Sequence, residues 1–138
     1  MVSKLRAIVL SAEAYQILGD YGKATALYET VLEKEGKTPY FKQFTEEIKI
    51  RLKKVYFDLV FKNGETEEMI DCIPKVVELG LSKREMAWVY KKIAESYSKE
   101  DFLEEARETL EKALAIYPRL EGTEKICKKL GLKRAGGL

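Results

Sequence analysis

The sequence predicts an all-α fold made of repeated pairs of antiparallel helices. Residues 87–118 contain two runs of apolar side chains at helical intervals, so each run shares one face of a helix. The runs are Tyr90, Ile93, Ala94 and Tyr97, and then Ala106, Leu110, Ala113 and Leu114. Similar runs recur in the first 36 residues, and a glycine or a proline follows each pair of runs. These observations together predict amphipathic helical hairpins.

The copy near the N-terminus keeps the same register. Its runs are Ile8, Ser11, Ala12 and Tyr15, and then Ala24, Tyr28, Val31 and Leu32. In both copies nine residues lead from the tyrosine that ends the first run to the alanine that opens the second. Two copies in one register indicate a repeat much more strongly than a single copy does.

These copies resemble the tetratricopeptide repeat, whose pattern is W-x2-L-G-x2-Y, then A-x3-F, then P. Ala94 and Ala106 stand where that family needs small side chains at the helix crossing, and Pro118 closes the unit. Tyr90 replaces the family's tryptophan and Leu110 its phenylalanine, and both positions stay apolar. The resemblance implies a short right-handed α-solenoid of about three repeats and a C-terminal capping helix.

We expect these parts to form a single domain over 1–138. The expected parts are repeat one at about 5–36, a degenerate and extended repeat two at about 39–81, repeat three at about 82–118, a capping helix at about 123–131 and a tail at 132–138. Four helix starts are expected to be capped by side chains that accept from free backbone N–H groups. The capping residues are Asp20, Ser82 with Glu85, Asp101 with Glu104, and Thr123.

Repeat two has an ambiguous register. Its apolar stripe allows either Leu59, ten residues before Met69, or Val60, nine residues before it, to end the first helix. Met69 stands where the family prefers alanine, which is expected to widen the helix pair. Pro74 is expected to kink the second helix or to shorten it so that it begins there.

An aromatic extension at 40–45 makes repeat two longer than the family repeat. It carries Tyr40, Phe41 and Phe44. These side chains either pack under the first repeat or remain exposed as a docking patch.

Composition argues against several classes of function. Lys and Arg number 25 against 23 Asp and Glu, so the net charge is only +2, which disfavours a nucleic-acid-binding protein. The chain has no histidine, no glycine-rich phosphate-binding loop and no cysteine pair with zinc-ligand spacing. We therefore expect no enzyme, no cofactor and no metal site.

Other features concern the source and the compartment. Abundant lysine and glutamate with few amides indicate either a thermophilic source or simply solvated helix faces. Cys72 and Cys127 are far apart in sequence and are expected to be reduced, which favours a cytoplasmic protein. No stretch approaches the length of a membrane span.

The resemblance also implies a binding groove, because the first helices of successive repeats in this family line a concave surface for a peptide or a partner helix. By spacing, its residues would be Arg6, Val9, Glu13, Arg51, Lys54, Asp58, Phe61, Trp88, Lys91 and Glu95. The basic members would meet carboxylates of an acidic partner, and the aromatic members would be apolar anchors. In the alternative interpretation, Lys54 with Asp58 and Lys91 with Glu95 satisfy each other, and Trp88 is buried.

Two other functions remain open. The chain would be a structural subunit that associates with its own copies or with a larger assembly, through the repeat ends or the aromatic extension. A weaker alternative is electrostatic binding of nucleic acid through Lys125, Lys128, Lys129, Lys133 and Arg134.

Overall fold

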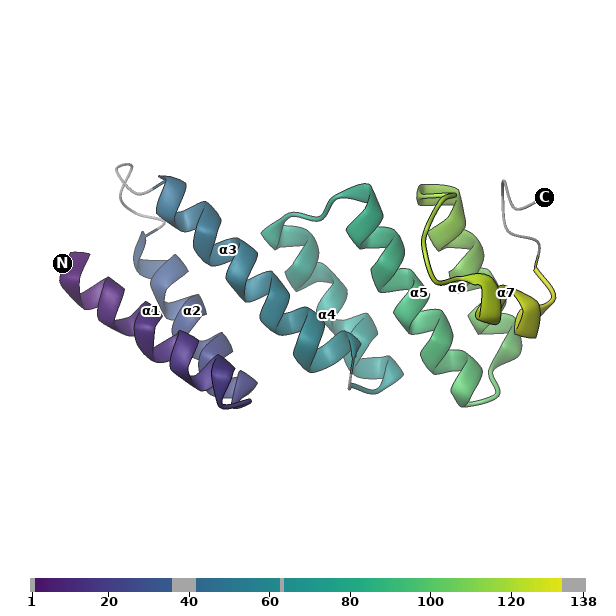
Figure 1. Cartoon of the computed structure of the whole chain (residues 1–138), viewed down its shortest axis with the longest axis horizontal. Helices are drawn as coiled ribbons and strands as arrows, with labels where there is room; N and C mark the ends of the chain where they lie inside the picture. The colour runs from purple at the N-terminus through teal and green to yellow at the C-terminus, as the bar shows by residue number, and fades with distance from the viewer. Residues whose placement is uncertain (1, 36–41, 63, 133–138) are drawn as a thin grey trace. The chain divides into compact units, whose positions relative to one another are not determined.

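The computed structural model describes residues 2–35, 42–62 and 64–132, which form only helices, turns and loops (Figure 1). The α-helices are α1 Val2–Ile17, α2 Tyr21–Glu35, α3 Lys42–Tyr56, α4 Thr66–Leu79, α5 Lys83–Lys99, α6 Leu103–Ile116 and α7 Glu124–Leu130. A π-helical turn, η2 Phe57–Phe61, directly follows α3. The prediction of an all-α repeat fold is confirmed.

The chain divides into two compact units, Met1–Leu59 and Val60–Leu138. Within each unit, helices that are neighbours in the sequence pack against each other. The pairs are α1 with α2 and α2 with α3 in unit 1, and α4 with α5, α5 with α6 and α6 with α7 in unit 2. The expectation of a single domain over the whole chain stays a prediction.

The α1–α2 hairpin of unit 1 forms where the sequence predicts it. Gly19 has a φ of 83°, a left-handed conformation that glycine adopts without steric cost, and it ends α1. Asp20 Oδ1 accepts a hydrogen bond from the backbone N–H of Lys23 at 3.3 Å, so Asp20 caps α2 as expected. The two helices approach closely because Ala12 and Ala24 are both fully buried between them.

Two buried tyrosines tie the helices of unit 1 together. Tyr28 is fully buried, and its hydroxyl donates to Gln16 Oε1 at 3.1 Å. Tyr56 donates in the same way to Glu29 Oε1. Burial raises the pKa of Tyr28, because desolvation disfavours the phenolate.

The π-helical turn resolves the register of repeat two. Up to Tyr56, the spacing of the buried residues would make Leu59 the next buried position on the same helix face. The extra residue in the turn shifts the buried face by one position, so Leu59 is 36% exposed and Val60 is buried instead. The nine residues from Val60 to Met69 then equal the spacing in the other repeats. The register that leads to Leu59 therefore describes α3, and the register that ends at Val60 describes the segment after the π-helical turn.

Unit 2 is built around one apolar cluster. Ala94 and Ala106 are both fully buried in it, as the crossing of α5 and α6 requires, and Leu110 fills the space beside them. Its other buried members are Ala87, Ala113, Leu114, Leu120, Ile126, Cys127 and Leu130. Ile126 and Leu130 of α7 thus cover the last repeat, as predicted.

Of the three other expected caps, one is confirmed and two are wrong. Ser82 and Glu85 form the full capping box at the start of α5. Asp101 does not cap α6, because it adopts a left-handed φ of 62° within the preceding turn and Phe102 occupies the cap position. Thr123 precedes α7, but its buried hydroxyl donates to the carbonyl of Leu120 at 3.3 Å instead of accepting from the helix.

Pro74 does not shorten the second helix of repeat two. The helix α4 begins at Thr66 and continues through Pro74 to Leu79. Met69 is buried within it.

Some predictions concern residues outside the described part of the chain. Tyr40 and Phe41 of the aromatic extension lie outside it, while residues 42–45 form the first turn of α3. The tail residues Lys133 and Arg134 also lie outside it.

Candidate functional site

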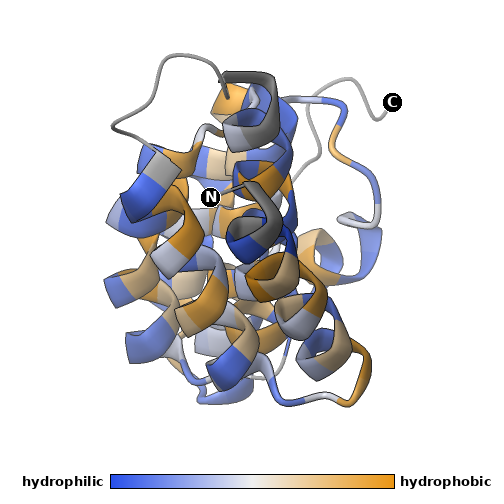
Figure 2. Cartoon of the chain, turned by 90° about the vertical axis from the view of Figure 1, so that its left-hand side faces the viewer, coloured by the Kyte–Doolittle hydropathy of each residue, from blue (hydrophilic) through white to orange (hydrophobic). Residues whose placement is uncertain are grey.

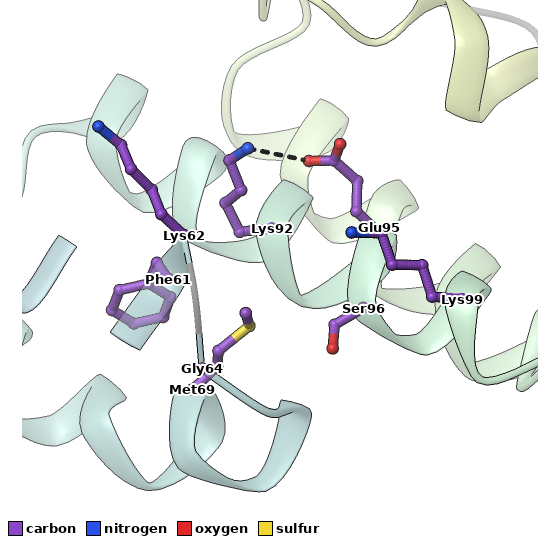
Figure 3. Close-up of a pocket in the computed structure, with 8 residues that line it drawn as sticks. All are labelled: Phe61, Lys62, Gly64, Met69, Lys92, Glu95, Ser96 and Lys99. Carbon is purple, nitrogen blue, oxygen red and sulfur yellow. Dashed lines mark ion pairs between the residues drawn. The ribbon is translucent and has the colours of Figure 1, made fainter. Parts of the chain in front are cut away.

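A pocket of about 190 Å³ lies within unit 2, where η2, the following turn, α4 and α5 meet (Figure 3). Its apolar part is formed by Phe61 and Met69. Its polar lining residues are Lys62, Lys92, Glu95, Ser96 and Lys99, and Gly64 completes it. Three ammonium groups against one carboxylate give the lining a net positive charge.

Phe61 connects the pocket to the only tryptophan of the chain. Its ring meets that of Trp88 edge to face, with centroids 6.2 Å apart and planes at 64°. Lys92 Nζ lies 5.6 Å from the centroid of the Trp88 ring, within the range of a cation–π interaction. Trp88 is half-buried and also packs against the apolar cluster of unit 2. Its indole is therefore held in place beside the pocket.

One ion pair lies within the lining. Lys92 Nζ is 3.5 Å from Glu95 Oε1, and the dashed line in Figure 3 marks this pair. Both side chains remain about one third exposed, with 28% for Lys92 and 35% for Glu95. Glu95 Oε1 itself is buried and accepts no hydrogen bond from the described residues, so water screens the pair only in part.

Hydrogen bonds fix the wall of the pocket behind Ser96. The hydroxyl of Thr66, at the first position of α4, is hydrogen bonded to the Ser96 hydroxyl. It also donates to Glu100 Oε1 at 3.2 Å. Thr66 is 4% exposed, so these bonds satisfy a buried polar group and join α4 to α5.

Gly64 allows the chain to turn sharply between η2 and α4. Its N–H donates to the carbonyl of Val60 at 2.7 Å. A Cβ atom at this position would lie 2.4 Å from that same carbonyl oxygen, which no side chain can tolerate without a backbone shift. The close approach of the backbone explains glycine here and forms one edge of the pocket.

Comparison with known proteins identifies the repeats. The model of the tetratricopeptide repeat matches residues 5–33 and 89–120. These two segments of the chain are tetratricopeptide repeats. The matched segments correspond to the first and third predicted repeats, and such repeats are generally protein-protein interaction modules that lack catalytic activity. No match was found among curated proteins or solved structures.

In repeat three, the structure changes the expected partners of the groove residues. Glu95 pairs with Lys92, and not with Lys91 one turn away. Lys91 instead donates to the backbone carbonyl of Glu121 at 3.4 Å, in the loop between α6 and α7. Only Trp88 and Glu95 of the expected set in this repeat lie at the pocket or beside it.

The expected groove residues of repeat one differ in accessibility. Val9 is only 6% exposed, so it belongs to the core of unit 1 and is not available to a partner. Glu13 forms an ion pair with Arg51 of α3, and both side chains are about one third to two fifths exposed. Arg6 is exposed on α1.

The expected groove residues of repeat two are split between the units. In unit 1, Lys54 is exposed and Asp58 is half-buried. In unit 2, Phe61 is only 1% exposed, so it supports Trp88 and does not itself present an open anchor.

Sequence reasoning missed the lysines of the pocket, although a signal was present. Lys92, Ser96 and Lys99 are four and three residues apart and thus share a face of α5, which Trp88, four residues before Lys92, continues. Lys62 offered no comparable signal, because its place depends on the π-helical turn before it.

Residues 2–35, 42–62 and 64–132 show neither a metal-binding cluster nor a membrane-spanning helix. Within these ranges no three His, Cys, Asp or Glu side chains are grouped so as to hold a metal ion. None of the helices described there has the length and the apolar character needed to cross a membrane. Cys72 and Cys127 are both free and buried.

Proposed function

We propose that this chain, with its tetratricopeptide repeats, is a non-catalytic interaction module that binds an acidic segment of a partner protein at the lysine-lined pocket of unit 2. The observation that supports this most directly is the lining of the pocket. Lys62, Lys92 and Lys99 surround a small apolar area, and Glu95 is the only acidic residue among them. Such a site favours a carboxylate on a short aliphatic stem.

The recognition would combine charge with apolar contact. A glutamate of the partner would place its methylene groups against the aliphatic stems of Lys92 and Lys99, because Phe61 and Met69 are almost fully buried, and its carboxylate near Lys92. It would share Lys92 with Glu95, whose Oε1 is buried and keeps Lys92 as its ion-pair partner. Lys62 and Lys99 would attract the acidic segment over a longer range.

Unit 1 offers separate basic contacts. Arg6 and Lys54 are exposed on the first helices of their repeats, where the family binds its partners. We include both as candidate contacts for acidic residues of a partner protein. Arg51 and Glu13, which already pair with each other, are expected to contribute less.

A cytoplasmic location is part of the same proposal. It is supported by the two free, buried cysteines, since a reducing compartment keeps thiols in this state.

Trp88 provides a direct assay, because it is the only tryptophan and its ring lies beside the pocket. We would titrate the protein with a glutamate-rich peptide and with the same peptide carrying glutamine in place of glutamate, following the tryptophan fluorescence. We expect saturable quenching or enhancement with the acidic peptide only. The affinity should fall as salt is added, because exposed charges are screened.

Charge reversal localises the site. Lys99→Glu should weaken binding about 10-fold, which equals about 1.4 kcal/mol. Lys112→Glu is the matched control, since Lys112 is an exposed lysine of α6 outside the pocket and the substitution changes the net charge equally. Equal weakening by both variants would show that only net charge matters, and the pocket would then be rejected as the binding site.

A further inference from the structure

The outward face of α1 is unusually apolar for a surface helix. Leu10, Ile17 and Leu18 are 60%, 85% and 78% exposed. Ala7 and Ala14 lie between them on the same arc and are also exposed. Exposed helix faces normally carry charged and polar residues, so this face is suited to contact with another protein surface.

The few polar groups on this face either have partners within the chain or lie near one end of α1. The centre of the face can therefore be buried away from water. The hydroxyl of Ser11 donates to the carbonyl of Ala7 at 3.0 Å, so burial of Ser11 would leave no unsatisfied donor. Glu13, the only acidic residue of α1, points to Arg51 of α3 and not to this face. The exposed charges of α1 are Lys4 and Arg6, both near its N-terminal end.

Figure 2 is turned so that the side on which Figure 1 labels α1 faces the viewer, and the helix that starts at the N label carries orange, hydrophobic positions. The last helix of the chain is different. In α7 the apolar residues Ile126 and Leu130 are buried, while Lys125, Lys128 and Lys129 face water. Of these two helices, α1 alone presents an apolar face, which disfavours stacking of α1 on α7 of another copy.

We propose that the outward face of α1 pairs with the same face of a second copy of this chain, with the two α1 helices antiparallel. Charge complementarity favours this occupant and this direction. The basic N-terminal end of one α1, with Lys4 and Arg6, would meet the negative C-terminal end of the other helix and its Asp20, which remains 45% exposed although it pairs with Lys23. A parallel pair would instead place the two basic ends together.

The spacing of the residues fits a two-fold axis near Ser11. Ala7 would then lie opposite Ala14 of the second copy, which permits close approach of the backbones. Lys4 would lie opposite Leu18 of the second copy, where its aliphatic stem covers the leucine and its ammonium remains in water. This inference is independent of the pocket in unit 2.

The expected dimer is weak. A helix of 16 residues is about 24 Å long, so one helical face buries less than the roughly 800 Å² per partner of a standard interface. We therefore expect association at about 10 µM to 1 mM of protein.

Sedimentation equilibrium of the whole chain tests the surface. The mass of the wild type should rise from 15.9 kDa towards twice that value across this concentration range. Leu10→Lys with Ile17→Lys should stay at 15.9 kDa throughout, with an unchanged circular dichroism spectrum. The control pair, Ile70→Lys with Val77→Lys, changes exposed apolar residues of α4 equally and should dimerise like the wild type. A monomeric wild type, or a dimer that the α1 variant retains, overturns the proposal.

Cysteine cross-linking tests the direction of the helices. Ser11→Cys should form a disulfide-linked dimer under mild oxidation, because position 11 meets its own copy at the two-fold axis. Lys4→Cys and Leu18→Cys should cross-link when mixed but not alone. The wild type gives the background from the two buried native cysteines. Cross-linking of Lys4→Cys with itself would indicate a parallel pair, and that result or the absence of any cross-link overturns the proposal.

Discussion

Replacing Ala106 by leucine tests the crossing of α5 and α6. Ala106 is fully buried on α6, and Ala94 of α5 and Leu110 are fully or almost fully buried in the same cluster. The substitution places an isobutyl group where a methyl group now fills the space. Overpacking of a dense core costs about 1 to 3 kcal/mol. At roughly 4 °C per kcal/mol for a chain of this size, the melting temperature should fall by about 4 to 12 °C.

The assay is thermal and urea unfolding followed by circular dichroism. Ala115→Leu is the matched control, because Ala115 lies on the same helix but is exposed. This control should change the free energy of unfolding by less than about 0.5 kcal/mol. If both variants melt at the wild-type temperature, Ala106 does not lie at a tight crossing and the reasoning about small residues is refuted.

Three further predictions concern caps, backbone strain and pH. Ser82→Ala removes one half of the capping box of α5 and should cost about 1 kcal/mol in urea unfolding, whereas no loss would mean that the box is not formed in solution. Asp101→Gly should raise the free energy of unfolding by roughly 0.5 kcal/mol, because glycine adopts a φ of 62° without strain, and a loss of stability would contradict this. The melting temperature should be nearly constant between pH 6 and 8, since the chain has no histidine. It should fall in alkali, because burial raises the pKa of Tyr28 and of the Cys72 thiol. Their contributions are complete below the unfolded pKa values and are lost as pH rises through the folded ones, so a melting temperature that stays flat to pH 11 would refute this assignment.

The general fold could be predicted because it depends on local patterns. In repeats one and three, the spacing of apolar residues and the alanines at the helix crossings specify which helix faces are buried. This holds without knowledge of which residues pack against those faces. Gly19 and the Ser82 box could be predicted for the same reason, since caps act within one turn of the chain. Asp101 shows the limit of this reasoning. A residue that can cap a helix can equally occupy the left-handed turn before it, and the choice depends on where Tyr97 and Phe102 pack.

The candidate site was less accessible to sequence reasoning, because its residues come together through tertiary contacts. Spacing placed Lys91 beside Glu95, but the loop at Glu121 offers Lys91 a carbonyl, and Lys92 reaches Glu95 instead. Val9 had the spacing of a groove residue, yet its side chain is buried in unit 1. The spacing of side chains along one helix does not reveal which neighbouring helix covers them.

The π-helical turn at 57–61 has a consequence for how the chain can vary in length. One residue inserted into an α-helix rotates everything after it by about 100°. The wide turn absorbs that rotation over five residues, so α3 keeps its helical phase and Phe61 still reaches Trp88. Deleting one residue here would rotate Phe61 and Lys62 away from the pocket while the buried residues of α3 kept their places. We therefore expect a change of a single residue in length here to alter the pocket of unit 2 without altering the core of unit 1.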